Sequence, residues 1–140
     1  MKLLFLIMLF ISSWAIAQSE IKFIVNASNP VPSITNEQVQ DFYLKRVRVW
    51  PDGIPLRFFD RREGTPERKT FISQHIKKTP RKIDQYWIGQ KLFSGDSAPT
   101  QLPSDSLTVA LVSRFAGGIG YVSGDFKGAT GVKIIEVKGE

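Results

Sequence analysis

The order of strand-like and helix-like segments constrains the fold of this chain more than any other feature. Short runs of apolar, β-branched and aromatic residues predict strands at 21–25, 56–59, 119–122 and 132–137. Apolar side chains at helical spacing, preceded by capping residues, predict helices at about 35–44, 65–76, 79–93 and 104–115. This order, β-α-β-α-α-α-β-β, predicts an α/β domain in which helices flank a central mixed sheet.

Hydroxyl residues and prolines mark the expected helix starts. Thr65-Pro66-Glu67 combines a capping hydroxyl, a proline at the first helical position and an acid in the first turn, and Thr79-Pro80 repeats the first two. The caps expected for the first and last helices are Ser33 or Thr35 and Ser104 or Asp105. The helix side chains expected to face the core are Phe71, Ile72, Ile76, Ile83, Tyr86, Trp87, Gln90, Leu107, Leu111 and Phe115. The segment 94–103 is expected to be a loop.

The first seventeen residues have the features of a secretory signal peptide. Lys2 provides a positive charge, 3–11 is an apolar run, and Ala15-Ile16-Ala17 is a small-x-small cleavage site. The apolar run is too short to cross a bilayer as a helix, which argues against the alternative of a membrane anchor. We therefore expect cleavage before Gln18, a single domain over 18–140 and a periplasmic location.

The composition excludes several kinds of site. There is no cysteine and a single histidine, His75, so disulfides, thiol nucleophiles and Cys/His zinc sites are ruled out. Lys and Arg number 19 against 13 Asp and Glu, for a net charge of +6. In an exported protein such charge meets small anions, lipid head groups and cell-wall polymers, so nucleic acid is not an expected partner.

The segment from Asp60 to Pro66 is the strongest candidate for a binding site. It follows a predicted strand and opens a predicted helix, where free backbone N–H groups and the helix dipole favour an anion. Arginine adds planar donors that suit phosphate or carboxylate. The candidate ligand-binding residues are Arg61, Arg62, Gly64 and Thr65. The alternative is a capped helix whose arginines pair with Asp60 and Glu63 at the surface.

No catalytic set, cofactor motif or metal site is evident. His75 lies inside a predicted helix and is expected to be packed or partly exposed rather than a general base. The segment 117–120 is glycine-rich but precedes a strand, so it predicts a turn and not a phosphate-binding loop. Trp50 and Trp87 are expected to anchor the core. The hydroxyls of 94–97 form either a second polar group or, as we expect, a surface loop.

Four segments, in order, resemble the periplasmic phosphate-binding proteins of the type 2 periplasmic binding protein superfamily. They are Asn29-Pro30-Val31 with 42–53, Arg61-Arg62-Glu63-Gly64-Thr65 with the residues up to Phe71, Tyr86-Trp87 with the residues up to Gly95, and Gly117-Gly118-Ile119-Gly120-Tyr121-Val122. The second resembles the family's phosphate loop, except that Pro66 and Glu67 stand where glycine and threonine are expected. Proline removes an amide donor and glutamate adds like charge, and both changes weaken a phosphate site.

The resemblance implies a fold and a function. Members of the family have two lobes, and this chain has the length of one, so a single-lobe member is expected. It implies binding of phosphate or another small oxyanion, without catalysis, through Arg61, Arg62, Gly64 and Thr65. The partners it implies are an ABC permease, a porin or a sensor kinase, and pairing with a second copy would restore a closed cleft. The alternative is a protein-interaction module that contacts a transporter, porin or sensor and has no ligand of its own.

Overall fold

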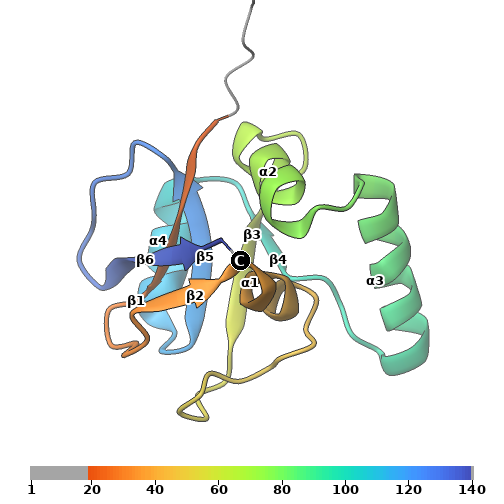
Figure 1. The fold of residues 1–140 in the computed structure, drawn as a ribbon, viewed down its shortest axis with the longest axis horizontal. Helices are drawn as coiled ribbons and strands as arrows, with labels where there is room; N and C mark the ends of the chain where they lie inside the picture. Colours follow the sequence, from red (N-terminus) through yellow and green to blue (C-terminus); the bar gives the residue numbers. More distant parts are fainter. Residues whose placement is uncertain (1–18, 140) are drawn as a thin grey trace, which may run out of the picture.

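A computed structural model describes residues 19–139 of the chain. These residues form one six-stranded sheet with helices on both faces (Figure 1). The strands are β1 (Ile21–Asn26), β2 (Ser33–Thr35), β3 (Arg57–Arg61), β4 (Thr100–Leu102), β5 (Gly118–Ser123) and β6 (Val132–Lys138). The predicted α/β class is confirmed. The predicted leader and its cleavage before Gln18 lie outside the described residues.

The strand order across the sheet is β2-β6-β1-β5-β3-β4. Only β1 runs against its neighbours, pairing antiparallel with β5 and β6 in the described part of the chain. β3 pairs parallel with both β5 and β4, and β2 pairs parallel with β6. The carboxyl ends of β3, β4 and β5 therefore lie at the same edge of the sheet.

The helices begin where the capping residues predict. They are α1 (Asn36–Tyr43), α2 (Pro66–Phe71), α3 (Pro80–Ser94) and α4 (Asp105–Arg114), with N-caps at Thr35, Thr65, Thr79 and Ser104. Each capping hydroxyl accepts a backbone N–H from three residues later, which satisfies one of the free donors of the first turn. Of the alternatives left open by the sequence, the structure selects Thr35 and Ser104.

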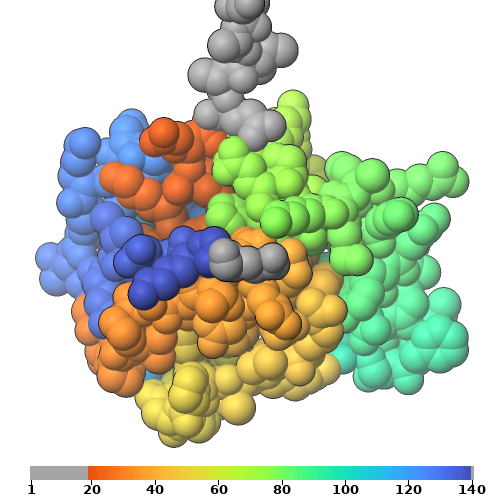
Figure 2. Space-filling model, in the orientation of Figure 1, coloured from red at the N-terminus to blue at the C-terminus, as the bar shows by residue number. Residues whose placement is uncertain are grey.

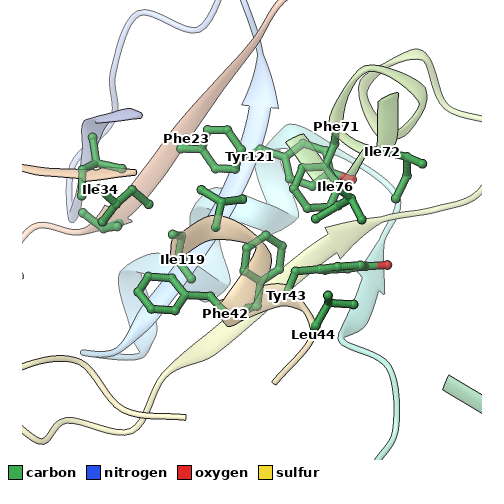
Figure 3. Packing of buried hydrophobic residues seen from close by; sticks show 14 of the residues in the cluster. Phe23, Ile34, Phe42, Tyr43, Leu44, Phe71, Ile72, Ile76, Ile119 and Tyr121 are labelled. Atoms are coloured by element: carbon green, nitrogen blue, oxygen red, sulfur yellow. The ribbon is translucent and has the colours of Figure 1, made fainter. Parts of the chain in front are cut away.

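Two apolar clusters pack on opposite faces of the sheet. Because side chains alternate along a strand, Phe23 and Val25 of β1 enter the larger cluster, beneath α1, α2 and α3, while Ile24 enters the smaller one, beneath α4. In the larger cluster the rings of Phe71 and Tyr121 stack with centroids 4.4 Å apart (Figure 3). Trp50 and Trp87 are buried in the same cluster, as expected. α4 thus covers one face alone, and the other helices share the opposite face.

Three features differ from the sequence-based expectations. β2 and β4 are short edge strands in segments that were expected to be a helix cap and a loop. Each has only three residues, which is too short for an alternating pattern to be recognised in the sequence. β3 extends through Arg61, beyond the expected end at residue 59, so Arg61 belongs to a strand. Leu107 was expected to face the core but is exposed, because α4 turns Thr108 and Val112 inward.

The helix that begins at Pro66 changes its winding after one and a half turns. α2 continues into a π-helical segment, η1 (Ile72–Ile76), which ends at Lys77 in the left-handed conformation. The predicted helical range of 65–76 and its buried residues Phe71, Ile72 and Ile76 are confirmed. Among residues 19–139, no helix combines the length and apolarity needed to cross a bilayer.

Candidate functional site

The candidate site lies at the edge of the sheet where β3, β4 and β5 end. β3 leads into α2 through the segment 62–65, and β4 leads into α4 through Pro103 and Ser104. Two helix starts therefore meet the ends of three parallel strands. This is the edge at which open α/β sheets commonly bind ligands, because backbone N–H groups of the helix starts face outward there.

Arg61 is the last residue of β3 and is buried, with 4% of its surface exposed. Its Nη2 donates to the carboxylate of Asp105, the first residue of α4. Asp105 also accepts the hydroxyl and the backbone N–H of Ser123, at the end of β5. Burial alone would raise the pKa of Asp105, but the hydrogen bonds from Ser123 and Arg61 outweigh it and hold this pKa below its usual value. Asp105 is thus ionised at neutral pH and balances the charge of Arg61.

The Arg61 guanidinium nevertheless keeps unused donors. Its Nε is buried and has no hydrogen-bond partner. Its Nη1 makes no hydrogen bond within the described part of the chain either. A guanidinium has five N–H donors, so one contact with Asp105 leaves most of them free. A buried polar group without a partner is costly in a folded protein and marks a site where a ligand could supply the missing acceptor.

The segment from Arg62 to Thr65 forms a tight, exposed turn. The carbonyl of Arg62 accepts both the backbone N–H of Thr65, at 3.3 Å, and its hydroxyl, at 2.8 Å. Gly64 has φ +83°, a conformation that favours glycine. The backbone N–H groups of Glu63 and Gly64 donate to no other group among residues 19–139. The turn therefore presents free amides beside the exposed side chain of Arg62.

Strand alternation separates Arg61 from this turn. Arg61 points to the α4 face, where Phe59 also packs, whereas Asp60 points to the α2 face, where Phe58 packs. The structure therefore brings Arg62, Gly64 and Thr65 together in one turn, and places the Arg61 guanidinium across the sheet edge from them. The alternative pairing predicted for Arg61, with Asp60 or Glu63, is wrong, because its partner is Asp105.

Asp60 is the centre of a buried polar cluster that the sequence did not reveal. Its carboxylate accepts Arg68 Nε at 3.2 Å, the Tyr43 hydroxyl at 3.3 Å, the Tyr121 hydroxyl, and the backbone N–H of Arg61 at 2.7 Å. Burial, and then the charge of Asp60, raise the pKa of Tyr43 and of Tyr121 well above the usual tyrosine value. Both hydroxyls therefore stay protonated and act as donors. The one sequence feature that points to this cluster is that Asp60 and Arg68 lie on either side of the helix start at Pro66.

Two cavities flank the start of α2 and differ in charge. One, of about 420 Å³, lies between α2 and α3 and is lined mainly by apolar surface with three cations, Arg68, Lys69 and Lys78, near Glu63 and Asp84. The other, of about 430 Å³, is lined by three acids, Glu20, Glu67 and Asp125, with no cation. An anion is therefore favoured on the side of the turn that faces α3. Gly64 lines that first cavity.

The other residues considered in the sequence, His75 and the segment 94–97, make contacts that hold the fold together. His75 is half-buried, with Nδ1 2.8 Å from Asn36 Oδ1 and its ring edge against Phe23. The segment 94–97 is held by Arg48, which pairs with Asp96, and by Lys45, which donates to the carbonyl of Ser97. Within residues 19–139 no group of three or more histidine, aspartate or glutamate side chains is placed to hold a metal ion.

Comparison with known proteins finds similarity at the level of structure. No protein-family model matches the sequence, and no curated protein matches it. Among solved structures, an ABC-type phosphate transport receptor from Vibrio cholerae superposes with a TM-score of 0.66 at 20% identity, over 85% of this chain and 46% of the receptor. PstS from Borrelia burgdorferi superposes with a TM-score of 0.67 at 15% identity, over 86% of this chain and 47% of that protein.

A third similar structure contains its ligand. It is a protein described as a phosphate ABC transporter substrate-binding protein from Clostridium perfringens, solved with bound phosphate, with a TM-score of 0.63 and 20% identity. The chain spans less than half the length of these proteins. The chain therefore has the fold of one part of these proteins, as the sequence resemblance led us to expect.

Proposed function

We propose that this protein is an exported, non-enzymatic binding domain that takes phosphate or a similar small oxyanion at the edge formed by Arg61, Arg62, Gly64 and Thr65. The observation that carries the proposal is the Arg61 guanidinium, which is buried and held by Asp105 but retains donors with no acceptor. The anion would accept these donors from one side and the free amides of the Glu63–Gly64 turn from the other. The similar structures are phosphate receptors, which supports this choice of ligand.

The geometry also sets the expected strength of binding. The turn is exposed, so an anion there stays largely hydrated, and exposed charge pairs contribute little. Asp105 and Glu63 lie close by and repel a second negative charge. We therefore expect a dissociation constant on the order of millimolar, far weaker than a closed two-lobed site would give. Such a domain suits the sensing or transfer of an abundant anion in the periplasm, alongside an ABC permease, a porin or a sensor kinase.

Titration calorimetry of the purified protein with phosphate, sulfate and a nucleotide tests the proposal. We expect saturable heat with phosphate, weakened roughly tenfold or more by Arg61→Ala, because a charged hydrogen bond contributes about 1.5–3 kcal/mol. Arg62→Ala, at an exposed position of the turn, should weaken binding less. The matched control is Arg114→Ala, which removes the same charge from the last turn of α4, far from the site in sequence. If Arg61→Ala folds and binds phosphate as the parent does, Arg61 is not a site residue.

A second candidate function is a protein-interaction module without its own ligand. The observation that favours it is the ion pair itself, since Asp105 already neutralises Arg61. No heat with any of the three anions, together with a stable complex between the purified protein and a purified permease, porin or sensor domain, would favour this function over oxyanion binding.

A further inference from the structure

The cavity between α2 and α3 has a buried inner wall and an exposed mouth. Among the residues that line it, Arg68 and Ile72 are 7% and 5% exposed and form the inner wall. In Figure 2, α2 and the first turns of α3 are the green segments at the upper centre and upper right of the molecule. The volume of about 420 Å³ lies within the range of small-molecule binding sites. The other lining residues are exposed and form the mouth, among them Lys69, Ser73, Lys78 and Pro80.

The inner wall presents hydrogen-bond donors that no residue uses. Arg68 Nε donates to Asp60 at 3.2 Å. Arg68 Nη1 and Nη2 form no hydrogen bond within residues 19–139, although the Tyr43 oxygen lies near the guanidinium. Neither Nη atom is both buried and unpaired, so both are accessible from outside. Because Arg68 is more than nine-tenths buried and lines the cavity, the cavity is the opening through which these donors can be reached.

The Arg68 guanidinium stays charged in these surroundings. Burial alone would lower the pKa of Arg68, but the charges and hydrogen bonds of Asp60 and Tyr43 outweigh it and raise this pKa above its usual value. The Asp60 carboxylate already accepts four donors, so it does not occupy the Nη groups. The two Nη groups form a planar fork that suits the two oxygens of one carboxylate. A ligand with a planar, singly charged head group therefore fits these donors.

Bases outnumber acids around the cavity. Its lining contains three bases, Arg68, Lys69 and Lys78, and two acids, Glu63 and Asp84. The segment 77–82, which leads from η1 into α3, contains no acid and adds Lys77, Arg81 and Lys82. Within residues 19–139, Lys69 and Lys78 form no side-chain hydrogen bond or ion pair. The positive potential favours entry of an anion, and the two acids favour one negative charge over two.

The rest of the inner wall is apolar. Ile72 belongs to the larger apolar cluster and lines the cavity together with Arg68, and Pro80 extends the apolar surface to the mouth. A bare inorganic anion would leave this surface in water, and a purely apolar molecule would leave the Nη groups without an acceptor. We propose that the cavity binds a small organic carboxylate, whose oxygens accept the Nη groups of Arg68 and whose apolar body packs against Ile72 and Pro80.

This site goes beyond the oxyanion site proposed above and uses a different cation. Arg61 pairs with Asp105 on the α4 face of the sheet, whereas Arg68 pairs with Asp60 on the opposite face. A carboxylate at Arg68 therefore does not require an oxyanion at Arg61. The two proposals can fail independently.

A titration of the ¹⁵N-labelled full-length protein with benzoate, followed by nuclear magnetic resonance, tests the proposal. We expect saturable shifts of backbone amides in the segments 68–73 and 78–84, with a dissociation constant on the order of 1 mM for so small a ligand. Benzyl alcohol, which keeps the ring and lacks the charge, should bind roughly tenfold more weakly or not at all, because it cannot form the charged hydrogen bonds.

Two variants locate the carboxylate and its apolar body. Arg68→Lys keeps a positive charge beside Asp60 but removes the fork, so it should weaken benzoate binding roughly tenfold or more. Ser73→Phe fills the mouth from an exposed position without touching the buried ion pair, and should abolish binding. The matched control is Ser106→Phe, at an exposed serine of α4 on the other face of the sheet, which should leave benzoate binding unchanged. Circular dichroism of each variant checks the fold.

Four outcomes would overturn the proposal. They are no saturable shifts with benzoate, equal affinity for benzyl alcohol, benzoate binding that survives Ser73→Phe in a folded protein, and shifts confined to the segment 62–65. Phosphate calorimetry on Ser73→Phe keeps the two sites apart. Loss of benzoate binding with phosphate binding intact is the expected result, and a protein that binds benzoate but never phosphate would contradict only the oxyanion proposal.

Discussion

Asp60 shows how a single carboxylate can be accommodated inside an aromatic core. Four donors from four different parts of the chain satisfy its two oxygens, and one of them is the guanidinium of Arg68. Moving a charge from water into the protein interior costs several kcal/mol, and only a complete set of partners offsets that cost. The Asp60–Arg68 ion pair therefore joins the end of β3 to the first turns of α2, beside the candidate site.

The first residue-scale prediction follows from this cluster. Arg68→Ala should lower the free energy of unfolding by about 3–5 kcal/mol, because it leaves the Asp60 carboxylate buried without its cationic partner. The control is Lys69→Ala, which removes the same charge from the exposed neighbour and should change stability by less than about 0.5 kcal/mol. Urea unfolding followed by circular dichroism measures both. Equal losses in the two variants would show that the buried pair contributes nothing beyond the charge.

Residue-level contacts were the part of the site least accessible to sequence reasoning. The turn and its cap at Thr65 followed from local chemistry, because a hydroxyl residue directly before a proline is typical of an N-cap followed by the first helical position. The partners of Asp60 and Arg61 did not, because the strand was expected to end at residue 59, and only its continuation through Arg61 places these two side chains on opposite faces of the sheet. Asp105 and Ser123 are more than forty residues from Arg61, and no local pattern joins them to it.

At the scale of elements, the π-helical segment η1 adjusts the contact between α2 and α1. Its wider turn carries the N–H of Lys77 to the carbonyl of Ile72, at 2.8 Å, and leaves the carbonyl of His75 free. Asn36 and Gln40 of α1 both donate to that carbonyl, at 3.2 and 2.8 Å. The two helices are thus joined by polar contacts to a carbonyl in the last turn of η1.

The surroundings of His75 predict how stability depends on pH. Burial, and then the charge of Lys77, lower the pKa of His75 in the folded protein. The unfolded chain therefore takes up a proton more readily, and the contribution of neutral His75 is present above about pH 6.5 and lost as the pH falls below it. We expect the free energy of unfolding to decrease between about pH 7.5 and pH 5.5.

The variant His75→Gln removes this titration and keeps a side chain that can donate to Asn36. Its free energy of unfolding should change less over the same pH interval, measured by urea unfolding at each pH. The acids with lowered pKa values, Asp96 and Asp105, lose their contribution only near and below their usual pKa of about 4, so they do not obscure the effect. Identical pH dependence in the variant and the parent would contradict this account.

Element order was predictable, and the two shortest elements were not. The strands at β1, β3, β5 and β6 and all of the α-helices appear where apolar runs and caps place them. β2 and β4 are stabilised by pairing at the two borders of the sheet and not by their own sequences. The π-helical winding of η1 also has no local signal in the sequence.

At the scale of the whole molecule, the two apolar clusters are joined through the sheet that separates them. β1 contributes Val25 to one cluster and Ile24 to the other, and β5 does the same with Tyr121 and Val122. A loss of packing on either face must therefore loosen strands that both faces share. This predicts that the domain unfolds as one cooperative unit.

Ile24→Ala tests this cooperativity. It creates a cavity in the smaller cluster and should lower the free energy of unfolding by about 2–5 kcal/mol. Within the described residues, both tryptophans, Trp50 and Trp87, lie in the larger cluster on the opposite face. Tryptophan fluorescence and circular dichroism should nevertheless report the same, lowered urea midpoint. A fluorescence midpoint that stays at the parental value would show that the two faces unfold separately.

The position of β1 has a consequence for the way the chain acquires its fold. This strand is synthesised first among the described strands, yet it pairs only with β5 and β6, which are synthesised last. Its register joins Ile21 to Ser123 and Phe23 to Ile135, so the centre of the sheet closes across contacts of very high sequence separation. A nascent chain therefore cannot complete its core until β6, the last of the described strands, is available.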